Sequence, residues 1–84
     1  MSPMIRNMEE QKAKAKEKME KALDEYFNTF EKASNQKGFN INKIEQLTLE
    51  NQMKMRAVLE EAAGELASNI ELESKKNVLS AEVN

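Results

Sequence analysis

The chain has 84 residues, of which 33% are charged and 5% are aromatic, and its formal net charge is -2. It contains neither Cys nor His, which excludes disulfides and the usual zinc sites built from these residues. The slightly acidic balance argues against a nucleic-acid-binding domain, because such domains are usually basic.

The composition favours helices. Gly occurs twice and Pro once, and the abundant Ala, Glu, Lys, Leu, Met and Gln are strong helix formers. This predicts an all-α protein with long helices or a coiled coil. The mean hydropathy of -0.78 also suits a disordered chain, but the low net charge and periodic apolar residues favour folding. No apolar run approaches the roughly 20 residues that span a bilayer, and the start lacks a secretory signal. We therefore expect a cytoplasmic protein, or one exported by a route that needs no cleaved signal.

The first predicted helix covers about residues 5–35. Its apolar residues recur in steps of three and four, which is the helical period. Between residues 9 and 18 this stripe holds only alanines, and oppositely charged pairs such as Glu10–Lys14 support the helix there. We therefore expect the first half of this helix to be weakly anchored. The predicted core residues of this helix are Met19, Leu23, Tyr26, Phe27 and Phe30.

A turn is predicted over residues 36–40, where turn-forming residues gather and Gly38 can follow the helix in the left-handed conformation. The next helix has two possible starts. With Asn40 as N-cap, Phe39 and Ile44 would form a hydrophobic staple. With Asn42 as N-cap, a glutamate would complete a capping box. We prefer the first start, because it explains the apolar Phe39.

The second predicted helix covers about residues 41–73, followed by a frayed tail over 74–84. A short connection makes consecutive helices antiparallel neighbours, so we expect an antiparallel two-helix hairpin forming one domain over residues 1–84. Asn51 interrupts the apolar stripe, and either fixes the register or lies at the edge of a drifting stripe. The stripe supplies the other predicted core residues, which are Ile44, Leu47, Met55, Val58, Leu59, Ala62 and Leu66.

A second apolar set lies on the opposite side of the second helix, at steps of about 100° per residue. Two hairpins that pair into a four-helix bundle would bury two faces of each helix, and small residues would let another helix come close. We expect this set to bind a second copy, as a homodimer, or another helical protein. The alternative is that they are ordinary surface residues. The set consists of Leu49, Met53, Ala57, Gly64 and Ala67.

No motif for catalysis is present, since there is no His, no Cys and no Gly-rich phosphate loop. We therefore predict no catalytic residue, cofactor, metal or small-molecule substrate. The basic run Lys12–Lys18 lacks the interleaved aromatics that stack on bases, so a solvated helix face explains it better. The predicted function is a non-enzymatic protein-interaction module, such as an adaptor, chaperone-like subunit or regulator. The alternative is a nucleic-acid-associated accessory factor or a mobile-element-related helical protein.

The overall form is similar to that of small bacterial secretion chaperones, needle-type subunits and sporulation aspartyl-phosphate phosphatases. The phosphatases carry a Ser-Gln-x-Leu-Asp signature on their second helix. The matching stretch here reads Leu47-Thr48-Leu49-Glu50-Asn51, so the signature is absent and that activity is not expected. The resemblance implies a helical hairpin and no particular function.

Overall fold

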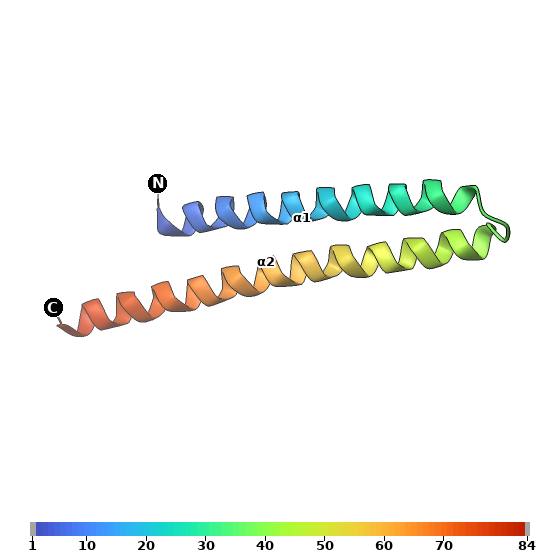
Figure 1. Cartoon of the computed structure of the whole chain (residues 1–84). Coiled ribbons are helices and arrows are strands. Elements are labelled where there is room, and N and C mark those ends of the chain that lie inside the picture. The colour runs from blue at the N-terminus through green and yellow to red at the C-terminus, as the bar shows by residue number, and fades with distance from the viewer. Residues whose placement is uncertain (1, 84) are drawn as a thin grey trace.

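Two long helices lie side by side and run in opposite directions (Figure 1). The computed structural model describes the backbone of residues 2–83 and the side chains of residues 2–76. Helix α1 spans Pro3–Ser34 and helix α2 spans Ile41–Val83. The molecule measures 71 × 21 × 10 Å, which is the shape of a single flat pair of helices. The predicted all-α hairpin is confirmed.

Helix α1 begins two residues earlier than expected, because a local cap defines its start. The backbone N–H of Ile5 donates to Oγ of Ser2 over 3.2 Å, and Pro3 occupies the first helical turn. Serine is a favoured N-cap, and proline is tolerated at the first helical position, where its missing N–H has no helical partner. The Ser2-Pro3 pair therefore sets the start of α1.

The turn between the helices is built on Gly38. Helix α1 ends at Ser34 with Asn35 as its C-cap. The N–H of Phe39 donates to the carbonyl of Gln36 over 3.4 Å, and Gly38 has a φ of 87°. A positive φ at the third position of a four-residue turn is the requirement of a type II turn. The prediction that Gly38 directly follows the end of the helix is wrong. Gly38 lies three residues beyond the C-cap Asn35 and shapes the turn itself.

Helix α2 begins at the preferred N-cap. Oδ1 of Asn40 accepts a hydrogen bond from the N–H of Lys43 over 3.1 Å, and its carbonyl accepts one from the N–H of Ile44 over 3.2 Å. Asn42 lies inside the helix, so the alternative start is wrong. Phe39 packs edge-to-face against Phe30, with ring centroids 5.3 Å apart. This aromatic contact ties the turn to the end of α1.

The predicted end of the second helix near Glu73, with a frayed tail over 74–84, is wrong. Helix α2 continues to Val83, and Asn84 lies outside the described residues. No Gly or Pro follows Glu73, so the sequence contains no strong helix breaker there. Because α2 has 43 residues and α1 has 32, α2 projects past the start of α1 (Figure 1).

The helices meet along a narrow seam that buries few side chains. On α1 the buried residues are Gln11, Ala22 and Ala33. They are spaced by 11 residues, close to the roughly 10.8 residues of three helical turns, so they form one straight line along the helix. The short side chains of Ala22 and Ala33 let α2 come close. On α2 the buried residue is Leu47, whose side chain is only 7% exposed. The seam therefore leaves the larger side chains of α1 on its flanks.

This seam changes the expected core. Leu47 is buried, and three predicted core residues, Leu23, Phe27 and Leu59, lie exposed at 45%, 60% and 57%. In a pair of helices, each helix buries only the side that faces its neighbour. Side chains that point away from this side therefore stay exposed. The remaining predicted core residues are half-buried, namely Met19, Tyr26, Phe30, Ile44, Met55, Val58, Ala62 and Leu66.

Candidate functional site

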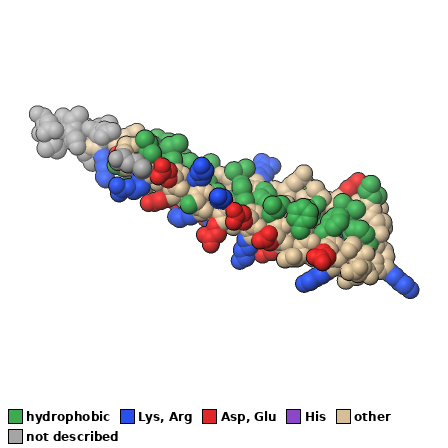
Figure 2. All heavy atoms as spheres, turned by 90° about the horizontal axis from the view of Figure 1, so that it is seen from above, with side chains coloured by type: hydrophobic (Ala, Val, Ile, Leu, Met, Phe, Trp, Pro, Cys, Tyr) green, Lys and Arg blue, Asp and Glu red, His purple; other side chains and the backbone are tan. Residues whose placement is uncertain are grey.

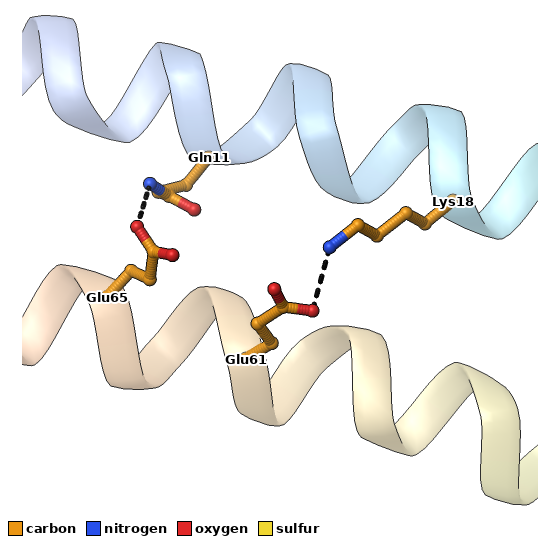
Figure 3. A network of polar contacts seen from close by, with 4 residues as sticks. All are labelled: Gln11, Lys18, Glu61 and Glu65. Atoms are coloured by element: carbon orange, nitrogen blue, oxygen red, sulfur yellow. Dashed lines mark hydrogen bonds and ion pairs between the residues drawn. The ribbon is translucent and has the colours of Figure 1, made fainter.

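One flank of the seam is polar and joins the helices by hydrogen bonds and ion pairs (Figure 3). Nζ of Lys18 lies 2.8 Å from Oε2 of Glu61. About two turns earlier on α1 and one turn later on α2, Nε2 of Gln11 donates to Oε2 of Glu65 over 3.0 Å. These contacts fix which residues of α1 and α2 lie at the same height.

Towards the turn, the same register continues. Nζ of Lys54 lies 3.5 Å from Oε2 of Glu25. The hydroxyls of Tyr26 and Thr48 share a hydrogen bond of 2.7 Å, and the Thr48 hydroxyl also donates to the carbonyl of Ile44 over 2.8 Å. Cross-helix contacts therefore run along most of the length of α1.

The ion pair changes the acidity of Glu61. The hydrogen bond from Lys18, followed by the charge of Lys18, holds the pKa of the Glu61 carboxyl below its ordinary value, and the charge of Lys14 acts in the same direction. Both side chains of the pair are about half exposed, at 48% and 56%. Solvent screens such pairs, so the ion pair orients the helices more than it stabilises them.

The other flank of the seam is an apolar groove of about 820 Å³. We call it the groove face. Figure 2 shows hydrophobic side chains gathered in a band along the length of the molecule, beside charged side chains. The apolar lining of the groove comes from both helices. It consists of Ile5, Met8, Ala15, Met19 and Leu23 from α1, and Met55, Leu59, Ala62 and Leu66 from α2.

Four large side chains of the groove face, those of Ile5, Met8, Leu23 and Leu59, are about half exposed. Ile5 is 49% exposed and Met8 is 52% exposed. Residues four apart lie on the same side of a helix, so two more exposed residues extend this face. Phe27 follows Leu23 by four residues, and Ile70, which is 48% exposed, follows Leu66 by four. The apolar surface therefore continues along the hairpin beyond the groove itself.

Charged residues border the groove on the α1 side only, and they are Glu9, Lys12, Lys16 and Glu20. The α2 residues that line it are all apolar. The predicted basic run is therefore divided: Lys12 and Lys16 border the groove, whereas Lys18 pairs with Glu61 on the polar flank. The helix does not gather these lysines into one basic patch.

The sequence did not predict the groove. It assigned Leu23 and Leu59 to the core, and Ile5 to no site. The available signal was the row of large residues at steps of four, Met19, Leu23 and Phe27, which drifts away from the straight line of buried residues. Periodicity identified the apolar side of the helix, but it did not show how much of that side the partner helix covers.

The residues predicted to bind a partner lie, as expected, on the side of α2 away from α1. Leu49 and Met53 are 58% and 65% exposed, and a Cβ added at Gly64 would meet nothing within 4 Å. Ala57 and Ala67 are also exposed. Partner binding by this set stays a prediction.

This outer set is broken by charge. Nε of Arg56 lies 2.9 Å from Oε1 of Glu60. Arg56 follows Leu49 by seven residues and Glu60 follows Met53 by seven, so both ions lie on the outer side of α2. The outer apolar surface is therefore smaller than the groove face.

Asn51 lies within the seam and not at its edge. It is half-buried, and its Oδ1 atom is buried with no hydrogen-bond partner in the structure. An unpaired buried polar atom costs free energy. This position agrees with the register-fixing interpretation of Asn51, and the edge interpretation is wrong.

In the part of the chain that the structure describes, neither helix has an apolar stretch long enough to cross a membrane. The described residues also contain no group of three or more Asp and Glu placed to hold a metal ion. No family model, curated protein or solved structure matches this chain.

Proposed function

We propose that this chain is a non-enzymatic protein-interaction module whose groove face receives the apolar side of another helical polypeptide. The observation that carries the proposal is the groove itself, in which half-exposed large side chains from both helices form one continuous surface. Monomeric proteins rarely expose large contiguous apolar patches, and such patches usually mark interaction sites.

The shape of the groove favours a helix as the occupant. It runs along the hairpin from Ile5 and Leu66 towards Leu23 and Met55. Rows of side chains at steps of four form ridges on each helix, and the ridges of another helix can pack between them. Amphipathic helices bind proteins through grooves of this kind. The charged residues on the α1 border would orient such a helix.

The outer set of α2 around Leu49 and Met53 is a second, smaller candidate surface. It comes from one helix only, and the Arg56–Glu60 ion pair interrupts it. Burial of apolar area drives association, so the groove face has the larger driving force.

Photo-crosslinking at two matched leucines tests the proposal. Leu59 of the groove face and Leu49 of the outer set are 57% and 58% exposed, so they differ in position more than in accessibility. Benzoylphenylalanine at position 59 of the full chain, expressed in its source cells, should crosslink to a polypeptide, which can be another protein or a second copy. Position 49 should crosslink far less. Crosslinks from position 49 alone, or from neither position, would contradict the proposal.

A further inference from the structure

We infer that the groove face packs against the groove face of a second copy of this chain, so that two hairpins form a four-helix bundle. The inference rests on the proposed role of the groove as a protein-binding surface, and it identifies the occupant. Each hairpin would supply one layer of two helices, and the apolar lining would become the core between the layers.

The exposed area of the hairpin supports a partner of its own size. The chain exposes 6961 Å², whereas the size scaling of folded monomers gives about 5,100 Å² for a 9.6 kDa chain. The excess is roughly 1,900 Å², and a standard interface takes only about 800 Å² from each partner. One ordinary interface along the groove face therefore fits within the excess.

The hairpin also lacks a core of its own. Among the described residues, the buried hydrophobic side chains are Ala22, Ala33 and Leu47. Small domains with so little buried apolar surface need disulfides, a metal or oligomerisation. With no Cys and no His, the chain lacks the first means and the usual ligands of the second. A second copy is the partner that accompanies every chain, so it is the occupant that can complete the core wherever the chain is made.

Two symmetric arrangements bring the groove faces together. If the two-fold axis runs along the helices, both turns lie at the same end and α1 faces α2 of the second copy. If the axis runs across the helices, the turns lie at opposite ends and each helix faces its own counterpart. The charges carried by the two helices distinguish these arrangements.

The cross-helix ion pairs give the heights of the border residues. In the register of Lys18–Glu61 and Glu25–Lys54, Lys16 lies level with Ala63 and Glu20 lies level with Leu59. At both heights α2 carries an uncharged residue, and the α2 residues that line the groove are all apolar.

With both turns at the same end, heights are preserved across the interface. Lys16 then lies level with Ala63 of the second copy, and Glu20 lies level with its Leu59. Each α2, which has an excess of acidic residues, faces an α1 of balanced charge.

With the turns at opposite ends and the groove centred on the axis, like charges meet. Lys12 falls opposite Lys16 of the second copy, and Glu9 falls opposite Glu20. The same arrangement brings the two α2 helices together, and each carries five basic and eight acidic residues, whereas α1 carries seven of each. Like charges across an interface oppose association. The geometry therefore points to the bundle with both turns at the same end.

A spin-label distance measurement tests the arrangement. The chain has no Cys, so Lys37→Cys provides a single labelling site at the turn. Sedimentation of the full-length chain should give the mass of two copies. The distance between the two labels should be well under half of the 71 Å length of the hairpin. A distance approaching that length, or the mass of one chain at high concentration, would overturn the inference.

Variants at the interface give an independent readout. Leu59→Glu should give the mass of one chain, and Leu49→Glu, its matched control, should keep the mass of two. Both leucines are exposed in the single hairpin, so the substitutions test the contact without disturbing the seam. The mass of two copies in Leu59→Glu, or disruption by Leu49→Glu alone, would refute the bundle.

The inference and the proposed function can fail separately. If position 59 crosslinks to a different protein while the purified chain has the mass of one copy, the second copy is not the occupant and the groove is still a binding site. If position 59 crosslinks to no polypeptide, both are wrong.

Discussion

Gly64 lies in the middle of α2, and no neighbouring atom is close enough to require a residue without a side chain there. Glycine in a helix is less favourable than alanine by about 1 kcal/mol, and a Cβ at position 64 would meet nothing within 4 Å. We expect Gly64→Ala to raise the free energy of unfolding by about 0.5–1 kcal/mol in urea titration. Gly38→Ala is the matched contrast, because the φ of 87° strains a side chain, and it should lower stability by about 1–2 kcal/mol. Loss of stability and self-association in Gly64→Ala would instead show a helix packed at Gly64.

Asn51 carries a cost of a different kind. Its Oδ1 atom is buried without a partner, and replacing such a group by an apolar one of similar size removes its desolvation penalty, about 1–3 kcal/mol. We expect Asn51→Leu to raise the urea midpoint, whereas Asn42→Leu, on the exposed start of α2, should leave it nearly unchanged. Destabilisation by Asn51→Leu would show that the amide has a partner in solution. A buried Asn fixes the register between helices. In the Lys37→Cys background, Asn51→Leu should therefore widen the distribution of distances between the two spin labels.

At the scale of elements, the start of α2 depends on one side chain. Oδ1 of Asn40 accepts the N–H of Lys43, and replacing an N-cap by alanine costs about 1 kcal/mol. Asn40→Ala should therefore lower the free energy of unfolding by about that amount, as measured by urea denaturation followed by circular dichroism. Asn42→Ala is the control inside the helix and should cause no loss. Equal losses in the two variants would mean that both residues cap the helix.

The contact between the elements should respond to pH through Lys18 and Glu61. The pKa of Glu61 is lowered in the hairpin, so its stabilising contribution is present above the ordinary glutamate pKa and disappears as the pH falls through the lowered value. We expect Lys18→Met to raise the pKa of Glu61 towards its ordinary value, as measured by carbon NMR titration of the carboxyl. Lys21→Met, at another exposed lysine of α1, should leave that pKa low. An unchanged pKa in Lys18→Met would show that the ion pair does not persist in solution.

Local signals predicted most of the secondary structure. The turn near Gly38 and the Asn40 cap were both found, because caps and turns depend on a few neighbouring residues. The Ser2-Pro3 start carried an equally local signal that had been overlooked. The end of α2 had no signal to find, since neither Gly nor Pro follows Glu73. Falling apolar periodicity was taken for the end of the helix, although it marks only the loss of a packing partner.

At the scale of the whole molecule, the sequence could not separate the core from the groove. Apolar periodicity selects one side of a helix, but the width that becomes buried depends on how many other helices cover it. In one hairpin the seam takes Ala22 and Ala33, and it leaves Leu23 and Leu59 outside. The prediction of a core containing those leucines describes the proposed bundle better than it describes the single hairpin. The heights at which residues of α1 and α2 face each other, in turn, required the register that only the structure supplies.

If the bundle completes the core, folding and association must be linked, and thermal stability must depend on concentration. A partner that binds only the folded chain stabilises it by mass action, and a hundredfold rise in concentration adds about 2.7 kcal/mol for a pair. For two 84-residue chains this corresponds to a rise in Tm of roughly 5–10 °C, measurable by circular dichroism. The Tm of Leu59→Glu should be lower and independent of concentration, and Leu49→Glu should follow the wild type. When folding and association are linked, the Tm must rise with concentration. A wild-type Tm that does not change with concentration would therefore mean that the narrow seam stabilises the hairpin without a second copy.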